Sequence, residues 1–111
     1  MMKLYITQLV PMRCSTKSEA VDLVRHCLET GKIIVSKHCR DELLKEGFDI
    51  LDAHYVLKKG NIFMEPEPDI RSGDWKYRME GKTVDGRALV VVFCFKAFDT
   101  SFLITAFSIT S

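Results

Sequence analysis

The stretch from Ser36 to Gly60 constrains the fold most, because it contains two short helices with their own start and stop signals. Ser36 and Asp49 are residue types that cap a helix by accepting a hydrogen bond from a backbone N–H of its first turn. The first helix is expected to end at Gly47 and the second at Gly60, because glycine is the residue that most often ends a helix. Apolar residues between these signals recur at helical spacing. We therefore expect two short helices, each with one face to bury.

A further helix is predicted before this stretch. Thr16 opens a Ser/Thr-x-x-Glu capping box, and apolar residues recur at helical spacing over 17–30 until Gly31 stops the pattern. Residues 33–35 form a short extended piece that leads into the next helix. Residues 1–15 are expected to form an additional strand or an arm.

After residue 60 the pattern changes to strands. Residues 65–74 form a proline-containing acidic loop, and Asp85-Gly86 is a strong hairpin turn signal. Residues 75–84 alternate, so that Lys76 and Arg78 share one face of a strand and Tyr77 points to the other. The expected strands are 61–64, 75–84, 88–95 and 102–109.

Together these patterns predict one α+β domain over residues 1–111, in which the helical half (16–60) packs on a C-terminal antiparallel sheet (61–111). A chain of 111 residues has no room for two cores. No segment approaches the roughly 20 apolar residues that a membrane-spanning helix needs. The four cysteines form no Cys-x-x-Cys pair, which favours reduced thiols in a cytoplasmic protein.

The net charge of the chain limits the kind of nucleic-acid binding that is possible. Sixteen basic and fifteen acidic residues leave a net charge of +1. Proteins that hold RNA through its phosphates are usually much more basic. Any nucleic-acid site in this chain must therefore be a local patch.

Short motifs along the chain resemble a known group of domains. They occur in the order Ser36-Lys37-His38, Arg40, Leu43-Leu44, Gly47-Phe48 and Lys59-Gly60. With the strands that follow, they are similar to an uncharacterised family of small bacterial domains grouped with RelE-, BrnT- and MqsR-like toxins of toxin–antitoxin pairs. The resemblance covers about residues 16 to 109. It implies a RelE- or MqsR-like fold, an endoribonuclease that uses no metal or cofactor, and partners that include an antitoxin protein and messenger RNA or the ribosome.

Such a ribonuclease lets the 2′-hydroxyl of RNA attack the neighbouring phosphate, so the protein must move protons and stabilise charge. His38, near a helix start, is the candidate acid or base. Arg78 and Lys76 are the candidate cations that stabilise the phosphate. Arg40 and Arg71 are candidate auxiliary phosphate contacts, and Tyr77 is a candidate stacking residue.

Each candidate also has a structural interpretation. His38 can be a structural histidine that forms hydrogen bonds with backbone groups. Lys76 and Arg78 can lie on a solvated sheet face and pair with Glu80. Tyr77 can be a core residue. The toxins named above carry a basic residue or an aromatic hydroxyl late in the chain, where this sequence has Phe107 and small residues.

Two further interpretations of the sequence concern metal binding and a different class of function. His26-Cys27 and His38-Cys39 do not have the spacing of a zinc site, so no metal is expected. The second function class is a non-catalytic protein-interaction domain with a toxin-like fold, which the near-neutral net charge favours.

Overall fold

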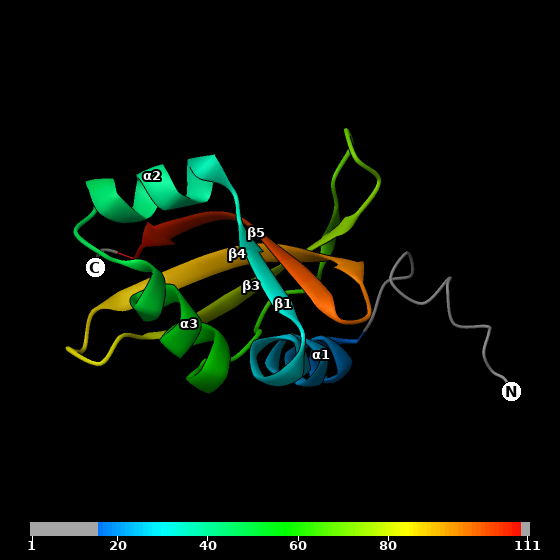
Figure 1. Cartoon of the computed structure of the whole chain (residues 1–111), viewed down its shortest axis with the longest axis horizontal. Coiled ribbons are helices and arrows are strands. Elements are labelled where there is room, and N and C mark those ends of the chain that lie inside the picture. Colours follow the sequence, from blue (N-terminus) through cyan, green and yellow to red (C-terminus); the bar gives the residue numbers. More distant parts are fainter. Residues whose placement is uncertain (1–15, 110–111) are drawn as a thin grey trace, which may run out of the picture.

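The computed structural model describes residues 16–109, and the strand or arm predicted over residues 1–15 lies outside the described residues. The described part contains three helices and five strands (Figure 1). The helices are α1 (Lys17–Thr30), α2 (Lys37–Lys45) and α3 (Ile50–Lys59). The strands are β1 (Lys32–Val35), β2 (Glu67–Pro68), β3 (Trp75–Lys82), β4 (Ala88–Ala97) and β5 (Thr100–Ser108).

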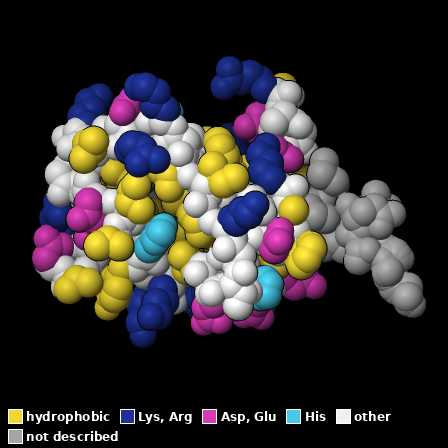
Figure 2. Space-filling view, in the orientation of Figure 1, with side chains coloured by type: hydrophobic (Ala, Val, Ile, Leu, Met, Phe, Trp, Pro, Cys, Tyr) yellow, Lys and Arg dark blue, Asp and Glu magenta, His cyan; other side chains and the backbone are white. Residues whose placement is uncertain are grey.

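The helices begin at the predicted caps. The Ser36 hydroxyl accepts a hydrogen bond from the Cys39 N–H at 3.0 Å. Thr16 and Asp49 each form a complete capping box at the start of α1 and α3. Gly47, just after α2, has a φ of +82°, a conformation that glycine adopts at little cost. On the face seen in Figure 2, cationic and acidic side chains are interspersed, in keeping with the net charge of +1.

The predicted α+β class is confirmed, with the helices in the N-terminal part and most strands in the C-terminal part. The sheet has the order β1-β5-β4-β3-β2. It is mixed rather than wholly antiparallel, because β1 pairs in parallel with β5, from Lys32 opposite Thr100 to Val35 opposite Leu103. The chain between these two strands is long and contains α2, α3, β2, β3 and β4. Such a connection permits parallel pairing, which a short hairpin would forbid.

The predicted strand over residues 61–64 is wrong. Asn61 pairs with β3 only through an isolated bridge to Glu80, with backbone N···O distances of 2.9 and 2.8 Å. The chain reaches β3 again at β2, which is two residues long. Pro66 and Pro68 have no N–H to donate, so this segment cannot extend a regular ladder.

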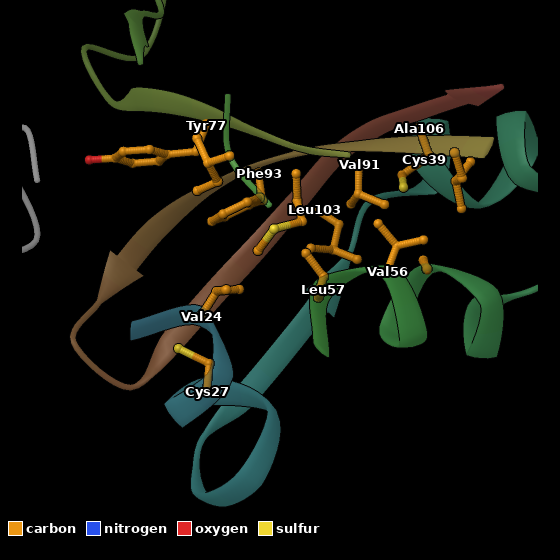
Figure 3. Close-up of a cluster of buried hydrophobic side chains, with 14 of the residues drawn as sticks. Val24, Cys27, Cys39, Val56, Leu57, Tyr77, Val91, Phe93, Leu103 and Ala106 are labelled. Atoms are coloured by element: carbon orange, nitrogen blue, oxygen red, sulfur yellow. The ribbon is translucent and has the colours of Figure 1, made fainter. Parts of the chain in front are cut away.

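The core lies between the helices and one face of the sheet. Tyr77 and Met79 of β3 are buried there, as the alternation in this strand predicts. Figure 3 shows Tyr77 and Phe93 on this side of the sheet, and their ring centroids are 5.7 Å apart. The helices contribute small and aliphatic side chains to the same cluster: Ala20, Val24, Cys27, Cys39, Leu43, Ala53, Val56 and Leu57.

The opposite face of the sheet, here called the open face, is covered by long side chains and not by a described helix. Val90, Val92 and Cys94 of β4 point to this face and are 8% exposed or less. Over the neighbouring strand β5, Arg78 lies above the Phe107 ring, and Lys96 lies above the Phe102 ring. The open face is therefore apolar at its centre and cationic above it.

A glycine holds the end of α1 against the turn between β4 and β5. A Cβ added to Gly31 would lie 2.1 Å from the Asp99 carbonyl oxygen, which is itself bonded to the Lys32 N–H at 2.8 Å. We expect Gly31→Ala to lower the free energy of unfolding by about 2–3 kcal/mol, because the backbone must move apart. Gly73→Ala is the control, since nothing lies within 4 Å of its added Cβ and it should cost only about 1 kcal/mol for its positive φ. Urea unfolding measures both, and an equal loss in the two variants would contradict this account.

Candidate functional site

A shallow pocket of about 280 Å³ lies on the open face and contains two of the predicted catalytic cations. β3 supplies Lys76 and Arg78, which the alternation places on one face. β4 supplies Val92. The remaining lining residues are Glu65, Glu67, Ile104, Thr105 and Phe107.

Arg78 is the central side chain of this pocket. It starts on β3 opposite Val92 of β4, and its guanidinium carbon lies 5.4 Å from the centroid of Phe107 on β5, so the side chain crosses β4. Its Nη1 lies 3.4 Å from the Met64 sulfur, a weak acceptor. Its Nε is buried and has no hydrogen-bond partner in the described part of the chain. The contacts with Phe107 and Met64 thus position the Arg78 guanidinium, while its Nε has no oxygen acceptor among the described residues.

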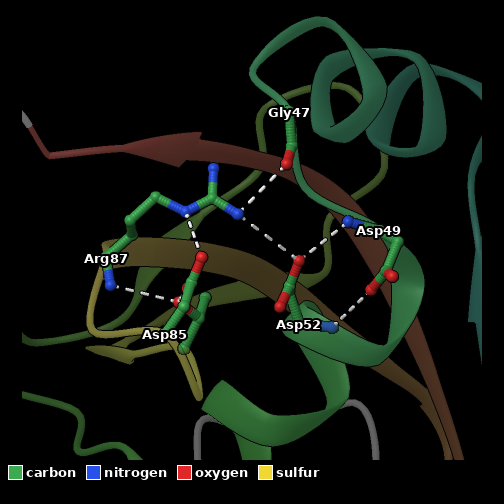
Figure 4. A network of polar contacts seen from close by, with 6 residues as sticks. Gly47, Asp49, Asp52, Asp85 and Arg87 are labelled. Atoms are coloured by element: carbon green, nitrogen blue, oxygen red, sulfur yellow. Dashed lines mark hydrogen bonds and ion pairs between the residues drawn. The ribbon is translucent and has the colours of Figure 1, made fainter.

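Arg87 provides a contrast within the same protein. Its guanidinium also stacks on a ring, 4.1 Å from the centroid of Phe48. It donates to Asp85 Oδ2 at 3.0 Å and to the Gly47 carbonyl at 3.1 Å, and lies 4.0 Å from Asp52 (Figure 4). Arg87 thus joins the end of α2, the start of α3 and the β3–β4 turn, and its charge is compensated by protein groups.

The two cations of the pocket form no ion pair with any other residue that the structure describes. Glu65 pairs with Lys17 at 3.1 Å, and Glu67 lies opposite Lys76 in the β2–β3 register. Within residues 16–109, no carboxylate oxygen lies within 4.0 Å of Lys76 or Arg78. The interpretation of these residues as a paired, solvated face therefore does not describe Arg78, whose Nε is buried.

His38 lies outside the pocket lining. It is exposed in the first turn of α2. The start of this helix is fixed to the pocket-lining strand, because the Ser36 hydroxyl donates to the Ile104 carbonyl at 3.0 Å and the Ser36 N–H donates to the Leu103 carbonyl at 3.1 Å. His38 is thus two residues along the chain from Ser36, which is hydrogen-bonded to Ile104 in the pocket lining.

The other predicted site residues lie elsewhere. Arg40 lines a separate hollow between α2 and α3. Arg71 is exposed in the turn before β3, where its backbone N–H donates to Asp69 at 2.9 Å. Tyr77 is 1% exposed on the helix-covered face of the sheet, opposite to the face that carries Lys76 and Arg78. The structure brings together only Lys76 and Arg78 of the six.

The described cysteines are not activated nucleophiles. Cys27, Cys39 and Cys94 are buried, and burial raises the pKa of each thiol to about 11. Among residues 16–109, no group of three or more His, Cys, Asp and Glu side chains is arranged to hold a metal ion. None of the described helices combines the length and the apolar character that crossing a membrane requires.

The residues that sequence reasoning missed include Met64 and Phe107, which contact Arg78, and Thr105, which lines its pocket. Part of the signal was available, because the Asp85-Gly86 turn sets Lys82 opposite Ala88 and hence Arg78 opposite Val92. The pairing of β4 with β5 has a register shift between Val92 and Phe93, which no local turn signal specifies.

A prediction about stability follows from the Nε of Arg78, which has no hydrogen-bond partner among the described residues. We expect Arg78→Met to raise the free energy of unfolding by about 1 kcal/mol, because it keeps the apolar cover of β4 and removes a buried donor that lacks an acceptor. Arg87→Met is the matched control and should lower it by about 1 kcal/mol, because that guanidinium has its acceptors. Thermal and urea unfolding compare the two, and a similar loss in both would show that Arg78 has partners in solution.

Comparison with known proteins gives one match. No curated protein and no solved structure is significantly similar to the chain. A family model described as a domain of unknown function, DUF4258, matches residues 35–108, which are 74 of the 111 residues. The match runs from the end of β1 to the end of β5 and includes the open-face pocket. The predicted membership of an uncharacterised domain family is confirmed, while its grouping with toxins stays a prediction. The chain belongs to the DUF4258 family.

Proposed function

We propose that this domain is a toxin-like, metal-independent endoribonuclease that holds the RNA backbone at the open-face pocket. The observation that carries the proposal is Arg78, a cation placed over an aromatic ring with a buried Nε that lacks an acceptor. Buried polar groups in proteins nearly always have a partner, and the exceptions call for an explanation such as a bound ligand. An RNA phosphate is a ligand that would supply the missing acceptor.

The pocket offers a phosphate several complementary groups. A phosphate would present two oxygens to Nε and Nη2 of Arg78, whose N–H groups point from one edge of the guanidinium, while Nη1 keeps its contact with Met64 on the other edge. Lys76 supplies a second positive charge on the same strand face. The Phe107 ring lines the same pocket beneath the Arg78 guanidinium, and an RNA base would stack on the opposite plane of that guanidinium.

The proposed reaction needs no group beyond the RNA and the protein. The 2′-oxygen attacks the adjacent phosphorus, the bond from phosphorus to the 5′-oxygen breaks, and a 2′,3′-cyclic phosphate forms. A base takes the proton of the 2′-hydroxyl, and an acid gives a proton to the leaving 5′-oxygen. Arg78 and Lys76 stabilise the negative charge that develops on the phosphorane oxygens.

His38 is the proposed acid or base, acting on RNA that extends from the pocket toward the start of α2. The bonds from Ser36 to the carbonyls of Ile104 and Leu103 support this, because they hold the first turn of α2 beside the strand that lines the pocket. Arg40 and Arg71 are proposed as contacts for more distant phosphates. Tyr77 has no part in this proposal, since its side chain lies on the other face of the sheet. The toxin resemblance also implies an antitoxin as protein partner.

RNA binding tests the pocket. We expect Arg78→Ala and Lys76→Ala to weaken binding of a single-stranded RNA and each to reduce the slope of log affinity against log salt by about 0.7, because each variant removes one phosphate contact. Lys82→Ala is the matched control, because Lys82 is an exposed cation of the same strand outside the pocket lining. Fluorescence anisotropy at several salt concentrations measures this. An equal effect of all three variants would mean that RNA binds through the overall positive charge of the surface and not through the pocket.

RNA cleavage tests the chemistry. The purified chain should cut RNA in the presence of EDTA and leave 2′,3′-cyclic phosphate ends. Arg78→Ala should lower the rate by about 10²–10³-fold and His38→Ala by about 10²–10⁴-fold, since they remove charge stabilisation and proton transfer respectively. Growth arrest on expression without a partner should follow the same order. Intact RNA, or cleavage that His38→Ala leaves unchanged, would contradict the assignment made here.

A second candidate function is a non-catalytic protein-interaction domain. Two observations favour it: His38 is not among the residues that line the cationic pocket, and leucines are exposed on the helices. Unaffected growth on expression of the wild-type chain, together with intact RNA, would select this function.

A further inference from the structure

The helix side of the molecule carries a groove that the open-face pocket does not explain. One hollow of about 340 Å³ lies between α2 and α3, and another of about 530 Å³ lies between α3 and α1. Leu51 lines both hollows, so they adjoin at this residue, and the two together are called here the helix groove. Its apolar lining includes Leu28, Leu43, Leu44, Phe48, Ile50 and Leu51.

Helix α3 has apolar side chains on two faces, and only one of them is used by the core. The buried face consists of Ala53, Val56 and Leu57. A second stripe, made of Leu51, His54 and Tyr55, has helical spacing and lines the groove. Leu51 is 73% exposed, and Leu44 on the neighbouring α2 is 66% exposed. Leucines that are this exposed and adjoin one groove are typical of a protein-binding site.

The charges around the helix groove are predominantly positive. Arg40, Lys58 and Lys59 line it and form no ion pair within residues 16–109. Counting Arg25, the lining carries four cations against two carboxylates, an excess of two (4 − 2). Figure 2 shows hydrophobic side chains gathered over α2 and α3, with both cationic and acidic side chains around them. An apolar groove with a cationic rim is complementary to an apolar segment with acidic flanks.

We propose that the helix groove binds an amphipathic helix of a partner protein, with apolar residues in the groove and acidic residues on its flanks. The groove follows α3, whose ten residues span roughly 15 Å at 1.5 Å per residue. A partner helix of about three turns fills this length, with anchors at positions i, i+3 or i+4, and i+7. The groove lies on the helix side of the sheet, so this inference is independent of the ribonuclease proposed for the open face.

Selection of peptides tests the proposal without assuming a partner. A display library of random peptides of about 14 residues, long enough for three to four helical turns, is selected on the full chain. We expect the enriched peptides to carry apolar residues at helical spacing together with Asp or Glu. Their affinity should fall by about tenfold or more for Leu51→Glu, because the change removes an apolar anchor and repels the acidic flanks. Val84→Glu, at a 78% exposed position in the β3–β4 turn, is the matched control and should bind as the wild type does.

Several results would overturn the proposal. They are a selection without enrichment, enriched peptides that lack the apolar and acidic pattern, and enriched peptides that bind Leu51→Glu as well as the wild type. A dimer in sedimentation that Leu51→Glu abolishes would assign the groove to a second copy and would also overturn it. Leu51 is largely exposed, so its substitution leaves the core intact, which circular dichroism checks. Leu51→Glu should keep RNA binding and Arg78→Ala should keep peptide binding, so failure of one site is distinguishable from failure of the other.

Discussion

The structure depends on the burial of β4, a strand that has no polar face to offer to water. Residues 89–95 of this strand are all buried, so both of its faces must be covered. The three helices cover one face and make the core with it. On the other face, long side chains from the adjacent strands provide the cover. Arg78 crosses from β3 to Phe107 on β5, and its aliphatic stem lies along apolar surface while it brings its charge over the sheet.

This way of covering a strand also produces the pocket proposed to bind RNA. Arg78 and Arg87 each stack on a phenylalanine, but of these two only Arg87 has oxygen acceptors for its guanidinium among the hydrogen bonds within residues 16–109. Arg78 keeps a buried donor unpaired, at a cost in stability that a bound phosphate would remove. The apolar groove lies on the other side of the sheet, where α3 presents a second apolar stripe. The two proposed partners, an anionic strand and an amphipathic helix, would therefore bind on different sides of the sheet.

Much of this architecture could be predicted because its causes are local. The capping residues Thr16, Ser36 and Asp49 fix where the helices begin through bonds three residues away. The period of two along β3 separates Arg78 from Tyr77, and the structure places them on opposite faces as expected. The segment 61–64 was mistaken for a strand because a short apolar run after a helix has no signal that distinguishes a strand from a single bridge.

The sequence by itself determined the three helices, the β3–β4 hairpin and the shared face of Lys76 and Arg78, since each follows from contacts between residues near in the chain. Tertiary structure alone decided that β1 lies parallel to β5 at the sheet edge. It also decided where Phe107 points. Beyond the irregularity at Ile104, Ala106 faces the core and Phe107 faces the open side, whereas strict alternation from the buried Leu103 would have turned Phe107 inward. A bulge exchanges the two faces of a strand, and it depends on pairing between whole strands, so no pattern within β5 reveals it.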